Sequence, residues 1–104
     1  MDRLTDDIQK TIRAIEALSE CSSTASEQID ELLDQLFQQK IDLAGATLNT
    51  SSPLYQQAAH SMSAAASKAA RAARDPAGTK AMIPVVEEAI GRLAKLLDSL
   101  GHAS

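Results

Sequence analysis

The chain has no tryptophan and only one tyrosine, one phenylalanine and one cysteine in 104 residues. A single cysteine excludes an intrachain disulfide. With two aromatic side chains, any core must be aliphatic, built from Leu, Ile, Val and many Ala in thin, closely approaching layers. Hydrophobic residues make up 44% of the sequence, which predicts a globular rather than a disordered chain.

Long apolar runs and phosphate-binding loops are missing as well. No apolar stretch approaches the roughly 20 residues of a membrane-spanning helix, and the charged start MDRLTDDIQK lacks the apolar centre of a secretory signal. We therefore expect a cytoplasmic protein, with export without a cleaved signal left open. The net charge of −4 disfavours nonspecific binding to nucleic acid.

The apolar residues that are present recur at helical spacing in four segments. The first runs from residue 2 to about residue 20 and stops in the hydroxyl-rich run 21–26. Its apolar positions are Leu4, Ile8, Thr11 or Ile12, Ile15 and Leu18, and its expected solvated face holds Asp6, Asp7, Lys10, Arg13 and Glu16.

The second segment begins at a capping box formed by Thr24 and Glu27. Gly45 weakens its last turns, and residues 49–52 form a turn. Its apolar face is broad, as is typical of a helix inside a bundle. We expect that face to comprise Ile29, Leu32, Leu33, Leu36, Phe37, Ile41, Ala44 and Leu48.

The third segment, residues 53–74, is the most distinctive, because nine of its 22 residues are alanine. Ser52 and Pro53 form a favourable N-cap and first-turn pair. The sequence Asp75-Pro76-Ala77-Gly78 ends the helix. One stripe of this helix holds Tyr55, Ala59, Met62, Ala66, Ala69 and Ala73, and the opposite side holds His60, Lys68, Arg71 and Arg74.

The fourth segment starts between Pro76 and Pro84. We prefer a late start, with Pro84 in the first turn and Glu87 and Glu88 near the positive end of the helix dipole. An early start would leave Pro84 inside the helix, where it would kink it. Its apolar positions are Ile83, Val86, Ile90, Leu93, Leu97 and Leu100, with Gly101 as the residue that follows the helix.

These segments predict one all-α domain spanning residues 1–104, a small antiparallel bundle of about four helices with up-down-up-down order. Charge suggests how the middle helices pair. Residues 21–50 hold five acids and one base, whereas residues 51–80 hold four bases and one acid. An antiparallel hairpin about residues 49–52 would set Arg74 level with Glu27, Arg71 with Asp30, and Lys68 with Leu33 and Asp34.

Groupings that would carry chemistry are not found in the sequence. Neither His60 nor His102 follows a glutamate by three residues, so the pattern of a di-metal bundle is missing, and the spacing suits no zinc site. We interpret His60 as a surface residue, His102 as a tail residue and Cys21 as an inert thiol. Adjacent carboxylates all fit solvated helix faces. We predict no enzyme activity, no cofactor, no metal and no small-molecule substrate.

The alanine stripe has two interpretations: it is the close-packed core face of the bundle, or part of it docks a partner helix or a second copy. The basic stripe of Lys68, Arg71 and Arg74, extended by Lys80, would contact the second helix or an acidic protein. The residues predicted to contact a partner are Tyr55, Met62, Ala66, Ala69, Arg71 and Arg74.

The sequence therefore predicts a protein-protein interaction module, an adaptor, export chaperone or inhibitor, which can self-associate as a homodimer and binds neither nucleic acid nor membrane. The alternative is a structural or exported subunit of a bacterial secretion system or phage assembly. In length and helical content the chain is similar to small bacterial secretion-system proteins. Without tryptophan it cannot contain the Trp-x-Gly turn of the hundred-residue secreted hairpin family.

Overall fold

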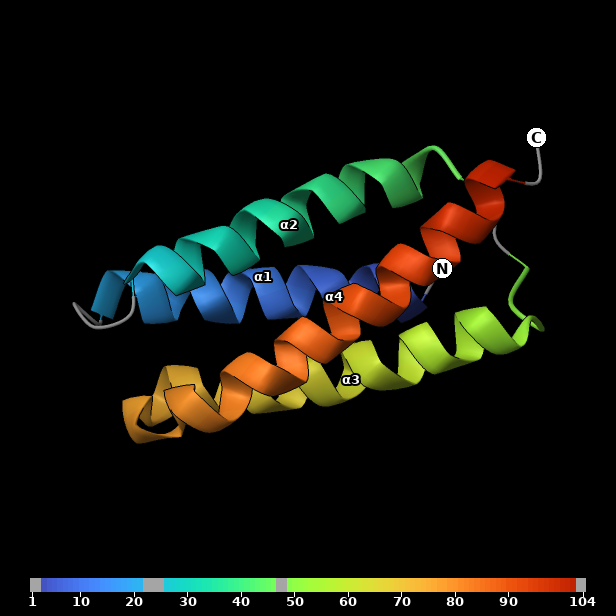
Figure 1. Cartoon of the computed structure of the whole chain (residues 1–104). Helices are drawn as coiled ribbons and strands as arrows, with labels where there is room; N and C mark the ends of the chain where they lie inside the picture. The colour runs from blue at the N-terminus through green and yellow to red at the C-terminus, as the bar shows by residue number, and fades with distance from the viewer. Residues whose placement is uncertain (1–2, 22–25, 47–48, 103–104) are drawn as a thin grey trace.

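The computed structural model describes residues 3–21, 26–46 and 49–102. These residues form α1 (Arg3–Cys21), α2 (Ser26–Ala44), α3 (Pro53–Arg74) and α4 (Thr79–His102), with a 3-10 turn at Pro76–Gly78. The helices lie lengthwise in a body of 43 × 21 × 20 Å, and successive helices run in opposite directions (Figure 1). The predicted all-α bundle with up-down-up-down order is confirmed.

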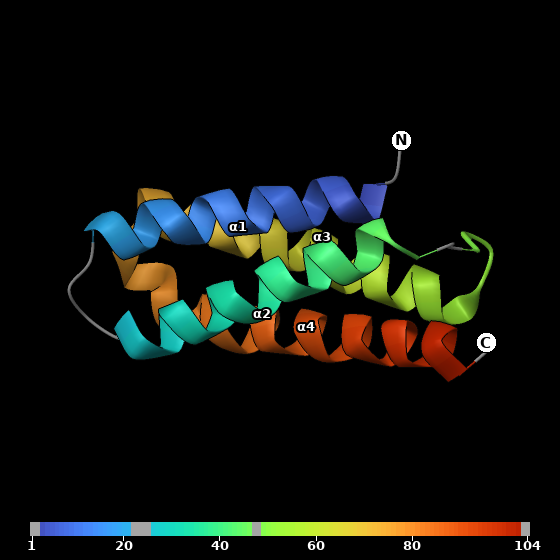
Figure 2. The same ribbon diagram turned by 90° about the horizontal axis from the view of Figure 1, so that it is seen from above.

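The helices are arranged as two stacked hairpins, α1–α2 and α3–α4. α1 packs on α2 and α3, and α4 packs on α3 and α2, which leaves α2 and α3 at opposite corners (Figures 1 and 2). In this arrangement α1 is parallel to α3, and α2 is parallel to α4. Two buried contacts show the register, because Thr11 touches Met62 and Gln39 hydrogen-bonds to Ile90, and each pair is 51 residues apart.

The predicted charge-matched hairpin of the second and third helices is therefore wrong. The eight residues 45–52 between α2 and α3 can span roughly 26 Å when extended, enough to cross the end of the bundle. Arg71 and Arg74 consequently lie on a helix that does not pack on the helix carrying Glu27 and Asp30. Within the described parts of the chain, one ion pair forms, between Glu88 and Arg92 at 3.5 Å on the surface of α4.

The core is aliphatic, as expected from the scarcity of aromatic side chains. All the predicted apolar positions of α1 are at most 1% exposed, and Thr11 is buried together with Ile12. α3 buries a wider arc than the predicted stripe, because it packs on both α1 and α4. Ala59 and Ala73 of that stripe are only partly buried. The buried residues of α3 are Tyr55, Ala58, Met62, Ala65, Ala66, Ala69 and Ala72.

Both ends of α3 are fixed as the sequence predicts. The Ser52 hydroxyl accepts a hydrogen bond from the Tyr55 amide at 3.2 Å, and Pro53 occupies the first turn. At the other end, the Asp75 amide donates to the Arg71 carbonyl at 2.8 Å. The Asp75 side chain then accepts from the Ala77 amide at 3.2 Å, which turns the chain toward α4.

The preferred late start of the fourth helix is wrong. α4 begins at Thr79, so Pro84 lies inside it as the sixth residue. A helical first turn brings Met82 and Ile83 into the core, where they are 0% and 9% exposed. Their burial offsets the backbone hydrogen bond that Pro84 cannot donate. The helix also continues through Gly101 to His102, so Gly101 does not follow its end.

Four predictions lie outside the described residues. They concern the Thr24 side of the capping box, the burial of Leu48, and the side chains of Cys21 and His102.

Candidate functional site

The six residues predicted to contact a partner fall into two groups. Met62 and Ala69 are 0% exposed, and Tyr55 and Ala66 are 8% exposed, so these four side chains belong to the core between α3 and its neighbours. A partner could not reach Met62 or Ala69 without separating the helices. Four members of the alanine stripe are therefore core residues, whereas Ala59 and Ala73 are only partly buried. Arg71 and Arg74 are exposed and free to contact a partner.

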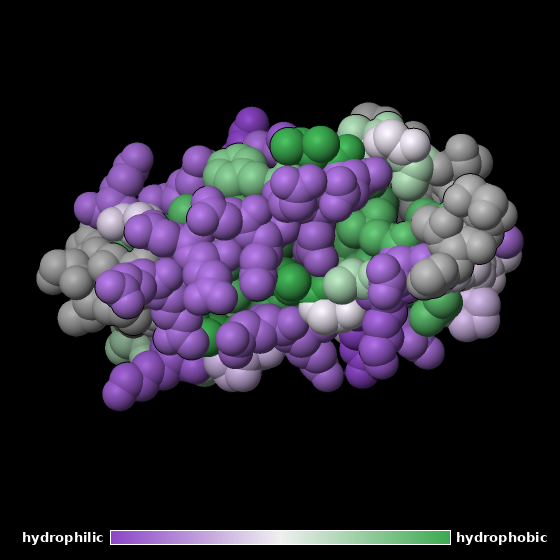
Figure 3. Space-filling view, turned by 45° about the horizontal axis from the view of Figure 1, so that its top comes forward, coloured by the Kyte–Doolittle hydropathy of each residue, from purple (hydrophilic) through white to green (hydrophobic). Residues whose placement is uncertain are grey.

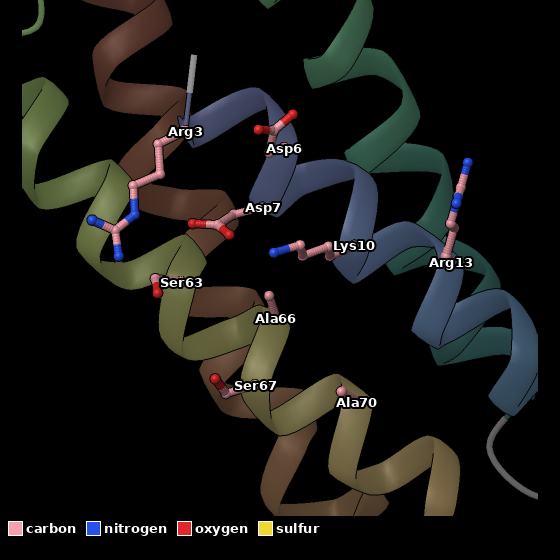
Figure 4. Close-up of a pocket in the computed structure, with 9 residues that line it drawn as sticks. All are labelled: Arg3, Asp6, Asp7, Lys10, Arg13, Ser63, Ala66, Ser67 and Ala70. Carbon is pink, nitrogen blue, oxygen red and sulfur yellow. The ribbon is translucent and has the colours of Figure 1, made fainter. Parts of the chain in front are cut away.

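A groove of about 550 Å³ follows the seam between α1 and α3. One wall of the groove is formed by small residues of α3, whose short side chains leave space beside the helix. They are Ser63, Ala66, Ser67 and Ala70. Long charged side chains of α1 form the other. Arg3, Asp7 and Lys10 point toward α3, whereas Asp6 and Arg13 point away (Figure 4). The groove thus gathers charges of both signs.

Asp7 is the least expected member of this groove. The sequence placed it on the solvated face of α1, but it is 7% exposed, and its Oδ2 atom has no hydrogen-bond partner among the described residues. The reason is the parallel packing of α1 on α3, which covers the flank of α1 that carries Asp7 and Thr11. The Thr11 hydroxyl donates to the Asp7 carbonyl at 2.7 Å and lies 3.8 Å from the Met62 sulfur. The Asp7 carboxylate is consequently held beside the wall of small α3 residues.

The largest exposed apolar side chains lie on α2. Phe37 is 40% exposed and Ile41 is 67% exposed, and Leu33 lies partly buried one turn before Phe37. We call these three residues the α2 ridge. Figure 3, which looks onto the side of the bundle that carries α2, shows apolar surface standing among hydrophilic side chains. Phe37 and Ile41 lie on neighbouring turns of the helix, so their exposed surfaces adjoin on one side of α2.

The predicted apolar face of α2 is wrong at Phe37, Ile41 and Ala44, which are exposed. The helix is rotated so that Gln39 faces the core instead. Its Nε2 donates to the Ile90 carbonyl at 2.9 Å, and this bond anchors α2 to α4. On the other flank, the Lys40 ammonium donates to the Gln9 side chain and ties α2 to α1. The buried residues of α2 are Ile29, Leu32, Leu36, Gln39 and Leu43.

The sequence did contain a signal for the exposed ridge. Asp30, Asp34, Phe37 and Ile41 are spaced by four, three and four residues, so they share one stripe of the helix. Two carboxylates on a stripe argue that it faces water. The spacing of the apolar residues alone assigns Phe37 and Ile41 to the core, because it takes no account of their acidic neighbours or of a buried polar residue such as Gln39.

Other kinds of site find no support in the part of the chain that the structure describes. No three His, Cys, Asp or Glu side chains gather there to hold a metal ion. None of the described helices combines the length and the apolar character that crossing a membrane requires. His60 is exposed on α3, as predicted. Comparison of the chain with protein-family models, with curated proteins and with solved structures finds no match.

Proposed function

We propose that the protein is a non-enzymatic protein-binding module, an adaptor, export chaperone or inhibitor, and that it binds its partner through the α2 ridge. The observation that carries this proposal is the exposure of Ile41 at 67% and Phe37 at 40% in a chain whose other large apolar side chains are buried or partly buried among the described residues. Removing both side chains from water would contribute about 2 kcal/mol to binding.

The surroundings of the ridge define the chemistry of the partner. Asp30 and Asp34 extend its stripe, and α2 as a whole holds five acids against the single base Lys40. An amphipathic helix with basic residues beside its apolar face complements this surface. We therefore propose α2 as the contact surface in place of the four predicted α3 residues that are buried, Tyr55, Met62, Ala66 and Ala69.

A pair of matched variants on α2 tests the proposal. The tagged wild-type protein, Ile41→Glu and Gln35→Glu are used side by side to capture proteins from the native cells, followed by mass spectrometry. Gln35 is exposed on the same helix away from the ridge, so its replacement adds the same charge elsewhere. We expect a partner in stoichiometric amounts that wild type and Gln35→Glu retain and Ile41→Glu loses. Equal recovery by all three proteins would contradict a role for the ridge.

The second candidate function is a structural subunit of a bacterial secretion or phage assembly. The observation that favours it is a difference in charge between two helices at opposite corners of the bundle. α2 is acidic, whereas the exposed side of α3 is basic and carries Lys68, Arg71 and Arg74. Ordered polymers that grow with protein concentration would support this function, and a protein that stays monomeric would count against it.

A further inference from the structure

We infer that copies of this protein stack head to tail, with the outer face of the α1–α2 hairpin of one copy on the outer face of the α3–α4 hairpin of the next. The inference rests on the proposed role of the α2 ridge as a contact surface and on the second candidate function, since it names a second copy of this chain as the occupant of the ridge. Within one chain, the two hairpins already stack with α1 parallel to α3 and α2 parallel to α4. A second copy would continue that stack.

The outer face of the α1–α2 hairpin is acidic and carries the ridge. Gln9 contacts Lys40, which identifies the flank of α1 that faces α2. Arg13, Glu16 and Glu20 continue this flank at helical spacing and are exposed. The face therefore presents Phe37 and Ile41 with four carboxylates, namely Glu16, Glu20, Asp30 and Asp34, and with two bases, Arg13 and the partly buried Lys40.

The outer face of the α3–α4 hairpin is basic and hollowed. Gln57 and Ser61 of α3 and Glu88 and Arg92 of α4 line a hollow of about 560 Å³ at the seam of the two helices. From Gln57 and Ser61 the same stripe of α3 continues at helical spacing through Ala64, Lys68 and Arg71. This face presents four bases and one acid, namely Lys68, Arg71, Arg92, Lys95 and Glu88.

The register within the chain predicts how the two faces meet. In each pair of parallel helices, a residue lies at the same height as the residue 51 positions later in the chain. The contacts of Thr11 with Met62 and of Gln39 with Ile90 show this register. At this offset, Glu20 of one copy lies level with Arg71 of the next, and Glu16 lies beside Lys68. The offset also places Phe37 and Ile41 level with Glu88 and Arg92. The ridge therefore meets the hollow while the acidic end of α1 meets the basic end of α3.

Pairing two α1–α2 faces would also bury the ridge, but it would oppose four carboxylates with four carboxylates. Like charges brought together across an interface select against that pairing. The head-to-tail contact joins different faces of the molecule, so each added copy leaves both faces free at the two ends of the stack. Association of this kind does not close at a dimer.

Sedimentation velocity from micromolar to millimolar protein tests the inference. We expect the average mass of the wild type to rise past that of a dimer with concentration, and to fall at high salt because the facing charges are screened. Ile41→Glu should weaken association at least tenfold, whereas Gln35→Glu should leave it unchanged. Circular dichroism of each variant shows whether the fold is intact.

Charge exchange distinguishes the two faces. Glu16→Lys with Glu20→Lys makes the acidic face basic, and Lys68→Glu with Arg71→Glu makes the basic face acidic. We expect each double variant to be monomeric alone and an equimolar mixture to recover the association of the wild type. Glu31→Lys with Asp42→Lys is the control, since it changes the charge by the same amount at exposed positions on the other flank of α2.

Three results would overturn the inference. They are a wild type that stays monomeric throughout the range, association that stops at a dimer, and a mixture of charge-exchanged variants that fails to recover association. The proposed function has its own outcome. If the wild type is monomeric but Ile41→Glu loses a cellular partner, the ridge binds another protein and only the stacking is wrong.

Discussion

α2 and α3 use their apolar residues in opposite ways. α3 is made largely of alanine, yet it packs tightly between α1 and α4 and buries seven side chains. α2 carries leucine, isoleucine and phenylalanine, yet it makes the fewest contacts of the four helices and leaves Phe37 and Ile41 in water. Small side chains let α3 approach α1 and α4 closely, whereas α2 packs less extensively on the same two helices and leaves one flank exposed. Hydrophobicity alone thus does not identify the core helix.

The largest effect is expected when a charge is introduced on the buried side of α3, and the same charge on its exposed side is the control. Ala69→Glu puts a carboxylate where the native side chain is 0% exposed, whereas Ala64→Glu puts it on the exposed side of the same helix. A buried unpaired charge costs several kcal/mol. We expect Ala69→Glu to lose about 4 kcal/mol of unfolding free energy or to unfold, and Ala64→Glu to change it by less than about 0.5 kcal/mol. Urea denaturation followed by circular dichroism measures both, and equal effects would show that α3 is not packed as described.

The next test uses adjacent residues of α2. Leu36 is 0% exposed and Phe37 is 40% exposed, although phenylalanine is the larger side chain. Leu36→Ala should destabilise the protein by about 3 kcal/mol because it leaves a cavity, and Phe37→Ala by about 1 kcal/mol or less. The same denaturation measurement applies. A larger loss from Phe37→Ala would mean that the ridge belongs to the core.

A smaller effect is expected at Asp7, the carboxylate covered by the parallel packing of α1 on α3. Asp7→Asn removes a charge whose Oδ2 atom has no partner among the described residues. We expect the unfolding free energy at neutral pH to increase by about 1 kcal/mol, since covering the Oδ2 position from water without a hydrogen-bond partner costs less for a neutral side chain than for a carboxylate. Asp6→Asn, at an exposed neighbour, is the matched control and should be nearly neutral. A marked loss of stability in Asp7→Asn would show that the charge is compensated in the native protein.

The smallest expected effect is at Gly91 of α4. It tests whether close packing is limited to the contacts of α3 with α1 and α4. Gly91 is an exposed residue within α4, and a Cβ atom added there meets no atom within 4 Å. Gly91→Ala should therefore raise the unfolding free energy by about 0.5 to 1 kcal/mol, as expected for an exposed helical glycine. A rise in melting temperature would confirm it, and a fall would indicate crowding on α4 that the structure does not show.

Local patterns in the sequence were sufficient to predict that four helices form, but not to predict where α4 begins. The three-four spacing of α1 and the Ser52-Pro53 pair predicted what the structure shows, because both depend on residues within a few positions of one another. The start of α4 was missed because it depends on tertiary burial of Met82 and Ile83, which outweighs the local preference of Pro84.

The candidate site was harder to predict because it depends on which helices become neighbours. Charge suggested that α2 and α3 pair, but surface ion pairs contribute only about 0 to 1 kcal/mol each. Surface ion pairs therefore cannot decide which helices pack together, because the burial of several aliphatic side chains contributes more to stability. Once α2 packs on α1 and α4, the rotation fixed by Gln39 and Lys40 exposes Phe37 and Ile41. Neither hydrogen bond can be predicted from the sequence of α2 alone.

Tyr55 gives this molecule an unusual optical property. In a chain without tryptophan, its ring is the one source of intrinsic fluorescence at tyrosine wavelengths, and it lies 8% exposed in the capped first turn of α3. Because α3 packs on α1 and α4, this emission reports the docking of α3 on those two helices rather than the packing of α2. Far-ultraviolet circular dichroism instead measures the helical content of all four helices together. If α2 detaches before the rest of the bundle opens, the helical signal falls while the tyrosine emission stays native.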